Sequence, residues 1–225
     1  MKKHHTEKNI PSETKEGIIL VDKPKGITSF DVIRKLRQKL GVYKMGHAGT
    51  LDPLATGLMI VALGSSTKKL TEYLKLPKTY EAEILLGTST DSGDITGKVL
   101  RDQSVEVTLL EAQNAIQGLR GTLKLPVPMY SAIKVQGVRL YTKARKGEVF
   151  ETPIKEMEVH KADLNEYYKE NGKVVLHVVF DVGSGTYIRS LAEEVGRRLN
   201  VPATIQVLRR TRIGDFSLEQ EHITL

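Results

Sequence analysis

The segment GHAGTLDPLATGLMIVALG, residues 46–64, joins a glycine-rich loop to an apolar run. The small residues before Asp52 disfavour a helix, and Pro53 has a fixed φ and no backbone donor. The apolar run from Leu58 to Leu63 predicts a buried strand. We therefore expect an ordered loop that enters a core strand and holds one carboxylate in place. Taken alone, Asp52 also fits a simple turn in which it caps local N–H groups.

The composition is that of a globular protein with an anionic partner among its candidate ligands. The chain has 225 residues, 40% of them hydrophobic, enough to bury a core as one large domain or two small ones. Its 34 Lys and Arg against 27 Asp and Glu give a net charge of +7, which favours a partner such as nucleic acid. The lack of cysteine excludes disulfides, thiolate metal sites and a cysteine nucleophile. Any side-chain nucleophile is therefore an oxygen or a nitrogen.

The first residues of the chain predict neither structure nor a targeting signal. Residues 1–16 are polar and are expected to form a disordered tail, in which His4 and His5 are tail residues rather than metal ligands. The sequence has no apolar core of signal-peptide length and no run long enough to span a membrane. We therefore expect a cytoplasmic protein.

The segment before the loop predicts a strand and a helix. Ile18–Val21 reads as a strand, followed by a Pro-Gly loop. Thr28 and Asp31 resemble a capping box, and Gly41 suits a helix end. The helix is expected to turn one apolar face to the core, formed by Phe30, Ile33, Leu36 and Leu40.

After the core strand, a short helix is expected over residues 67–74, and then a strand whose alternate residues share one face. Those residues are Tyr80, Ala82, Ile84 and Leu86. The turn TSTDSGDITG, residues 88–97, is acid-rich but lacks the ligand spacing of a calcium loop. We interpret it as a connection between strands.

The second half of the chain adds helices and a hairpin. A helix is expected from the box Thr108 to Glu111 as far as Gly118, and the turn ENG joins two β runs. A later helix carries an apolar stripe, and the last strand is TIQVLRRTRIGDF, residues 204–216. The stripe consists of Ile188, Leu191, Ala192, Val195 and Leu199. Strands outnumber helices and often neighbour each other, which predicts an α+β fold with a mixed, largely antiparallel sheet and helices packed on it.

The glycine-rich stretch GSGTYI, residues 183–188, follows a strand and opens a helix, as a dinucleotide-binding loop does. Its third glycine is replaced by Ile188, and too little chain follows for a doubly wound sheet. What remains is a helix N-terminus that carries Tyr187 and Arg189, where a planar cation can meet a carboxylate or a phosphate.

Five blocks of the sequence, in order, closely resemble the TruB-type tRNA pseudouridine-55 synthases. They are DKPKGITS, GHAGTLDPLATGLMIVALG, KTYEAEILLGTSTDSGD, PMYSAIKVQGVRLYTKARKGE and SGTYIRSLAEEVG. The resemblance covers the chain from about Gly17 to its end. It implies the pseudouridine synthase fold and an enzyme that isomerises the T-loop uridine of tRNA without a cofactor or a metal.

The resemblance also implies roles for single residues. Asp52 matches the catalytic aspartate, Tyr80 the active-site tyrosine and Arg189 the arginine that pairs with the aspartate. His47 matches the histidine that handles the flipped nucleotide, and Lys23 lies in the DKP motif. Tyr187 and Leu208 match residues that line the pocket, and an insertion over about residues 125–155 matches the region that grips the T-arm through Lys134, Arg139, Lys143 and Arg145.

The chemistry explains why these residue types would gather. Isomerisation breaks the bond from ribose C1′ to uracil N1 and forms one to C5, so an oxygen nucleophile can hold one fragment while the base turns. Burial would raise the pKa of Asp52 unless a cation such as Arg189 opposes it. Tyr80 can stack on uracil and take part in moving the C5 proton. Attack at C1′, attack at C6 and elimination to a glycal all remain open.

Simpler interpretations stand beside these. His47 also fits a loop hydrogen bonder, Tyr80 an ordinary strand aromatic, and the basic segment a solvated face. The alternative function is a non-catalytic RNA-binding or tRNA-folding protein on the same fold, and a remoter one is a hydrolase that uses Asp52. The chain ends at EQEHITL, without the PUA-type RNA-binding domain usual in bacterial members. We expect a catalytic domain over residues 17–225, acting as a monomer on tRNA.

Overall fold

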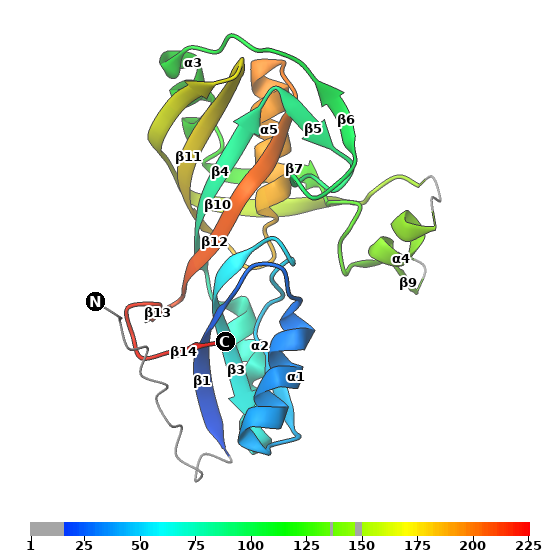
Figure 1. Cartoon of the computed structure of the whole chain (residues 1–225), viewed down its shortest axis with the longest axis vertical. Helices are drawn as coiled ribbons and strands as arrows, with labels where there is room; N and C mark the ends of the chain where they lie inside the picture. Colours follow the sequence, from blue (N-terminus) through cyan, green and yellow to red (C-terminus); the bar gives the residue numbers. More distant parts are fainter. Residues whose placement is uncertain (1–15, 136, 147–149) are drawn as a thin grey trace, which may run out of the picture.

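The apolar run after the Asp52 loop forms β3 (Thr56–Leu63), the middle strand of one half of a large sheet (Figure 1). The computed structural model describes residues 16–135, 137–146 and 150–225. One edge of β3 pairs antiparallel with β1 (Gly17–Lys23). The other edge of β1 pairs in parallel with β14 (Ile223–Thr224). The other edge of β3 pairs with β2 (Met45–His47) and, where β3 begins, in parallel with β12 (Ala203–Ile213). The expected loop therefore begins only after His47.

The other half of the sheet is antiparallel throughout. Its strands follow β12 in the order β4 (Lys78–Leu86), β11 (Lys173–Val182), β10 (Ile154–Glu170) and β7 (Gly121–Pro126). The alternation expected in β4 is confirmed, because Tyr80 and every second residue after it are buried. At the C-terminal end of β12, β13 (Phe216–Ser217) pairs antiparallel with it. The expected mixed, largely antiparallel sheet is thus confirmed.

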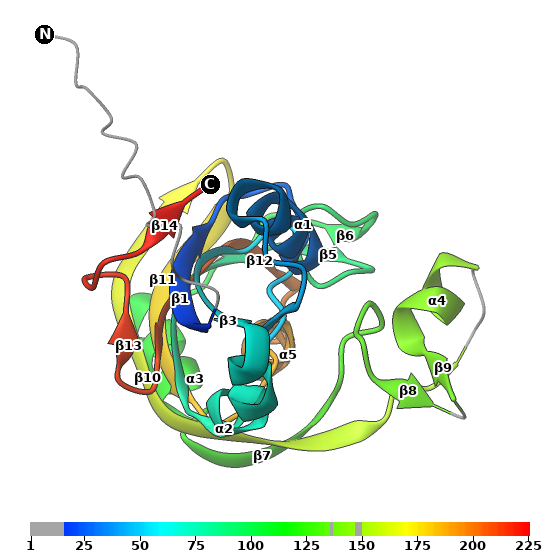
Figure 2. The ribbon, with the colours of Figure 1, turned by 90° about the horizontal axis from the view of Figure 1, so that it is seen from below.

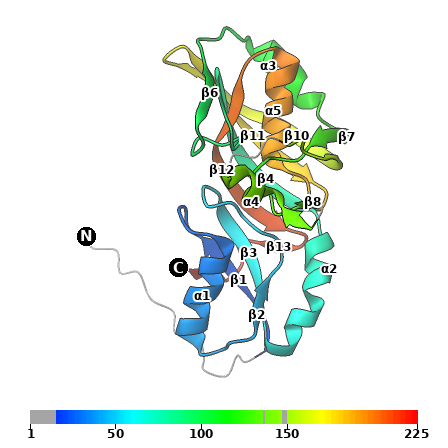
Figure 3. The ribbon, with the colours of Figure 1, turned by 90° about the vertical axis from the view of Figure 1, so that its right-hand side faces the viewer.

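Helices cover both faces of the half that contains β3 (Figure 3). The helix α1 (Ser29–Leu40) packs its buried residues on the face that Met59 and Val61 present. The 3₁₀ helix η1 (Gly64–Lys69) and the helix α2 (Leu70–Lys75) follow β3, and Leu70 packs on the opposite face, among the neighbours of Leu58 and Ile60. The helix expected over residues 67–74 therefore begins as a 3₁₀ turn.

The capping box predicted for α1 is present in both directions, and Gly41 ends the helix with φ of 65°. Ile33 and Leu36 are buried, but Phe30 is 62% exposed, so its expected place in the core was wrong. The reason is the neighbouring serine. In the first turn of α1 it is Ser29 that faces the interior, where its hydroxyl bonds the backbone N–H and C=O of Leu51.

The remaining helices and hairpins agree with the sequence. The acid-rich turn connects β5 (Thr88–Thr90) to β6 (Val99–Asp102), and α3 (Leu109–Gln117) has its predicted capping box. The β10–β11 turn places Asn171 and Gly172 at φ of 51° and 72°, as a tight hairpin turn requires. The helix α5 (Ile188–Leu199) buries its apolar stripe and packs on β12 and α3. No helix in the described ranges is long and apolar enough to cross a membrane.

The chain between β7 and β10 stands away from the sheet (Figure 2). It contains the short hairpin of β8 (Lys134–Val135) and β9 (Val138–Arg139) and the helix α4 (Leu140–Arg145). We call residues 127–153 the projecting lobe. It falls within the insertion expected over about residues 125–155, whose role stays a prediction. The expected tail at residues 1–16, with His4 and His5, lies outside the described residues except for Glu16.

The two halves of the sheet meet where β3 and β12 approach most closely. Arg209 lies opposite Thr56, and Arg210 opposite Gly57, whose φ is 105°. A Cβ on Gly57 would lie 2.2 Å from the backbone oxygen of Arg210. The Arg210 side chain is buried beside this contact and donates to the carbonyls of Leu58 (2.8 Å) and Gly49 (3.1 Å). Only glycine fits at residue 57.

Replacing Gly57 by alanine tests this contact. We expect Gly57→Ala to lower the free energy of unfolding by about 3 kcal/mol or more, since strain and overlap with backbone add together. Gly121→Ala is the matched control, because Gly121 has φ of 107° but nothing within 4 Å of the added Cβ. It should lose only about 1–2 kcal/mol. Urea denaturation measures both, and equal losses would contradict the steric argument.

Candidate active site

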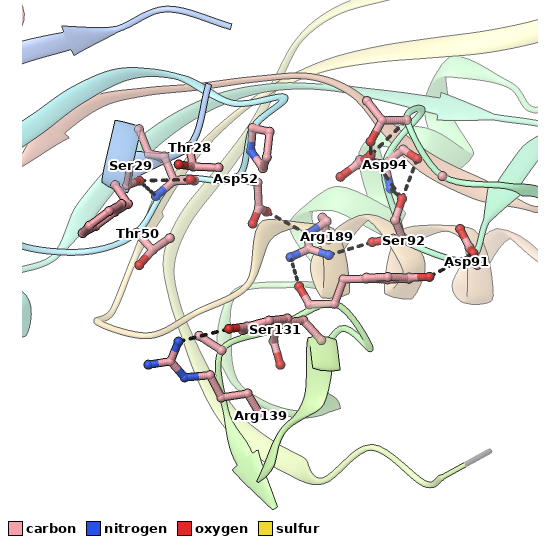
Figure 4. A pocket seen from close by; sticks show the side chains of 18 of the residues that line it. Thr28, Ser29, Thr50, Asp52, Asp91, Ser92, Asp94, Ser131, Arg139 and Arg189 are labelled. Atoms are coloured by element: carbon pink, nitrogen blue, oxygen red, sulfur yellow. Dashed lines mark hydrogen bonds and ion pairs between the residues drawn. The ribbon is translucent and has the colours of Figure 1, made fainter. Parts of the chain in front are cut away.

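An ion pair between Asp52 and Arg189 joins the loop before β3 to the first turn of α5 (Figure 4). The Arg189 Nε lies 2.9 Å from Oδ2 of Asp52. The other two guanidinium nitrogens donate to the backbone oxygens of Ser92 (2.7 Å) and Tyr130 (3.1 Å). One buried arginine therefore fixes the carboxylate, the acid-rich turn and the start of the projecting lobe relative to each other.

The electrostatics of Asp52 are balanced between burial and this cation. Burial raises the pKa of the carboxyl above its usual value, and Arg189 opposes the rise. The nearby Asp94 adds to the rise, whereas Lys23 opposes it. Without Arg189 the buried carboxyl would be far easier to protonate, so the arginine preserves the ionised oxygen that a nucleophile needs.

Lys23 lies beneath the loop rather than in a cavity. Its side chain is fully buried, and its ammonium donates to the backbone oxygens of Pro24 (2.9 Å), Ile27 (2.7 Å) and Pro53 (3.4 Å). Burial lowers the pKa of Lys23 to about 8, and the negative charge of the nearby Asp52 opposes this lowering. It lines neither of the cavities described below. The structure therefore places Lys23 where it holds the backbone of the loop, and its expected role in binding the substrate stays a prediction.

Two cavities meet at the ion pair. The inner cavity, of about 300 Å³, and the outer cavity, of about 1010 Å³, are both lined by Asp52 and Arg189. The inner cavity brings together three residues that the sequence pointed to, Tyr80, Tyr187 and Leu208. The outer cavity contains another three, His47, Lys134 and Arg139. Asp52 thus lies where a small cavity adjoins a wider one whose wall carries both cations and carboxylates.

The walls of the inner cavity suit a planar ring. Tyr80 is largely buried and Leu208 faces the same space, while burial raises the pKa of the Tyr187 phenol. Lys78 also lines this cavity and was missed in the sequence. Its ammonium donates to the backbone oxygens of Leu74 and Leu76, both at 2.6 Å, and burial lowers its pKa to about 8. Its place two residues before Tyr80, on the same face of a half-buried strand, was the available signal.

In the outer cavity, the predicted basic residues divide into two groups. Lys134 and Arg139 line the cavity, and Arg139 donates to the Tyr141 hydroxyl at 3.1 Å. Lys143 instead lies 6.0 Å from the centroid of the Phe150 ring and does not line the cavity. The side chain of Arg145 is outside what the structure describes.

His47 lies on the opposite side of the same cavity. Burial lowers the pKa of its imidazole, and the nearby Arg210 acts in the same direction. Its Nδ1 has no hydrogen-bond partner among the described residues. Burial therefore favours a neutral imidazole at the wall of the outer cavity, and the unpaired Nδ1 is itself buried rather than open to that cavity.

The acid-rich turn does more than connect two strands. Asp94 is buried and its Oδ1 accepts from the N–H and hydroxyl of Thr96 and from the hydroxyl of Ser92. This network shapes the turn whose Ser92 carbonyl receives Arg189. Sequence patterns could not show this, because the partner lies 97 residues away.

No cluster of three or more potential metal-ligating side chains occurs in the described part of the chain.

A carboxylate held by arginine thus lies between two cavities, the smaller lined by aromatic rings and the larger by both cations and carboxylates, as suits the active site of an enzyme. The sequence model of the TruB family pseudouridylate synthase N-terminal domain matches residues 37–188. The chain is 41% identical to tRNA pseudouridine synthase B of Fusobacterium nucleatum, over 91% of its length and 70% of the relative's. It is 44% identical to tRNA pseudouridine synthase B of Chlamydia pneumoniae, over 92% of this chain and 87% of the relative. The chain therefore belongs to the TruB family of pseudouridylate synthases, as its five sequence blocks predicted.

Solved structures agree with the fold. The chain is similar to one in a crystal structure of a Cbf5-Nop10-Gar1 complex, with a TM-score of 0.71 and 28% identity. It is also similar to one in an H/ACA RNP bound to a substrate RNA containing 2′-deoxyuridine, with a TM-score of 0.66 and 26% identity. The match to the Cbf5-Nop10-Gar1 structure covers 96% of this chain and 55% of the solved chain. The match to the H/ACA RNP structure covers 92% of this chain and 50% of the solved chain. The chain thus spans about half the length of these structural relatives.

The electrostatic balance at Asp52 leads to a direct test. Asp94→Asn removes a like charge but retains an acceptor oxygen, so the pKa of Asp52 should fall. Titration of the aspartate carboxyl carbons by ¹³C NMR measures this. Asp163→Asn is the control, because Asp163 pairs with Arg120 and Lys161 and should leave Asp52 unchanged. An unchanged or raised pKa of Asp52 in Asp94→Asn would refute the proposed balance.

Proposed function

We propose that this chain is a tRNA pseudouridine-55 synthase that isomerises the T-loop uridine with Asp52 as the nucleophile, after the base has been flipped, without a cofactor. The observation that carries the proposal is the Asp52–Arg189 pair at the passage between the two cavities. Membership of the TruB family supports the reaction class.

The flipped uracil occupies the inner cavity in this proposal. Tyr80 and Tyr187 offer aromatic faces for stacking, and Leu208 an apolar wall. Extrusion of the base costs a few kcal/mol, and His47, on the wall of the outer cavity, is placed to fill the space that the base leaves. The phosphates on either side of the target remain in the outer cavity, near Lys134 and Arg139.

The reaction then needs few groups. The bond from C1′ to N1 breaks, the uracil turns, a bond from C1′ to C5 forms, and the C5 proton moves to N1, so atoms and charge balance. An ionised Asp52 oxygen serves attack at C1′ or at C6, and also elimination to a glycal. Arg189 keeps that oxygen ionised, and the hydroxyl of Tyr80 is placed to take part in the proton movement.

The proposal extends to partners and organisation. Residues 17–225 act as the catalytic domain, and the projecting lobe grips the T-arm with Lys134, Arg139, Lys143 and Arg145. The domain works as a monomer in the cytoplasm, where tRNA is found. A non-catalytic role in binding or folding tRNA is the second candidate, because three cations of the outer cavity, Lys98, Lys134 and Arg139, are not paired with Asp52.

Asp52→Asn separates the two candidates. We expect this variant to form no pseudouridine on an unmodified tRNA transcript while binding it within a few-fold of the unchanged chain. Asp102→Asn is the control, because this exposed residue of β6 pairs with Lys173, lines neither cavity and should retain full activity. Substantial turnover by Asp52→Asn would exclude Asp52 as the nucleophile. An unchanged chain that binds tRNA but never modifies it would support the non-catalytic candidate.

Arg189→Lys tests whether the planar fork is needed. An ammonium cannot reach the carboxylate and two carbonyls in three fixed directions, so we expect kcat/KM to fall at least about 100-fold. The melting temperature should also fall, because two buried carbonyls lose their donors. Arg197→Lys, on the same helix but with an exposed side chain, is the matched control and should change neither. Normal kinetics for Arg189→Lys would remove Arg189 from the site.

A further inference from the structure

Phe30 is an exposed aromatic side chain at the wall of the outer cavity. It is 62% exposed although it belongs to the first turn of a helix whose next apolar residues are buried. It lines the outer cavity but not the inner one. An exposed phenylalanine loses part of the free energy of burial that its type usually contributes. Its position on the cavity wall leaves the ring free to regain that free energy by packing against a ligand.

The backbone at Phe30 is firmly held next to the catalytic loop. Ser29 bonds both backbone groups of Leu51, the residue before Asp52, at 2.8 and 3.1 Å. Thr28 and Asp31 close the capping box on either side. The ring therefore projects from a preorganised turn, which lowers the entropy lost when a ligand packs against it.

The surroundings of the ring fit a nucleotide. The same cavity is lined by two further aromatic residues, Tyr130 and Tyr141, and by both kinds of charge. The cations are Lys98, Lys134, Arg139 and Arg189, and the carboxylates are Asp52, Asp91 and Asp94. Aromatic faces together with a basic groove are how proteins bind single-stranded nucleic acid, because bases stack on the rings while phosphates meet the cations. An apolar ligand would not need the cations, and a phosphate alone would not need the ring.

We propose that Phe30 stacks on a base that neighbours the target uridine in the T-loop. This inference rests on the proposed function. The target base itself is assigned to the inner cavity, which Phe30 does not line, so the stacked base belongs to a flanking nucleotide in the outer cavity. When the target uridine is extruded, the flanking base loses a stacking neighbour. The Phe30 ring takes the place of that neighbour.

Binding of a T-arm hairpin tests the ring. Dissociation constants are measured in the Asp52→Asn chain, which prevents turnover. We expect Phe30→Ala to weaken binding by about 5- to 100-fold, the range for loss of one base–aromatic stack, and Phe30→Tyr to restore it. The matched control is Tyr43→Ala, because Tyr43 is 84% exposed and lines neither cavity. Melting temperatures should stay within about 2 °C, since no buried contact is lost.

Hairpins with an abasic site on either side of the target identify the partner base. At one of the two positions, the abasic site should weaken binding of the hairpin to the chain that retains Phe30. The same abasic site should not further weaken binding to the Phe30→Ala chain, because the stack is already lost there. Equal abasic losses in both chains, a Phe30→Ala constant matching that of Tyr43→Ala, or no recovery in Phe30→Tyr would overturn the inference. Pseudouridine formation by the unaltered chain on the intact hairpin is measured in parallel. Its absence would count against the proposed function, whereas the binding series decides the role of Phe30.

Discussion

The close approach of Gly57 to Arg210 is the constraint on which the rest of the site depends. It is the only place where β3 and β12 pair, over two residues, and it joins the two halves of the sheet. On the β3 side, Asp52 lies five residues before Gly57, and on the β12 side Leu208 lies two residues before Arg210. A residue with a Cβ at position 57 would overlap the backbone of Arg210 and so disturb the joint from which the Asp52 loop is held. The Arg210 side chain strengthens the joint by bonding carbonyls on both sides of the loop.

Buried cations around this joint are held mostly by carbonyl oxygens rather than by carboxylates. Lys23, Lys78 and Arg210 each donate to backbone oxygens, and Arg189 gives only one of its three groups to Asp52. Neutral carbonyls satisfy the donors without cancelling the charge, so a positive potential remains in the cavities. Burial of the two ammonium groups lowers the pKa values of Lys23 and Lys78 to about 8. The same potential would favour a polyanion that enters from the outer cavity.

The sequence predicted those parts of the fold that depend on neighbours along the chain. The core strand, both capping boxes, the alternation in β4 and the β10–β11 hairpin follow from short-range rules. Phe30 shows the limit, because helical spacing tells which residues share a face but not where the surface beneath that face ends. The site residues came from resemblance to a family, since no local pattern links Asp52 to Arg189. Asp94 and Lys78 escaped both approaches, because their roles depend on contacts that only the folded chain makes.

The position of β12 near the end of the chain has a consequence for folding during synthesis. The strands β1 to β3 can pair as soon as they emerge, and β4, β10 and β11 can pair once residue 182 is made. Until β12 follows, the start of β3 and one edge of β4 stay open to the solvent, and open edges invite pairing with other chains. A strand made late in synthesis thus closes both edges at once. Nascent chains stalled before residue 203 should aggregate far more readily than those released after residue 213.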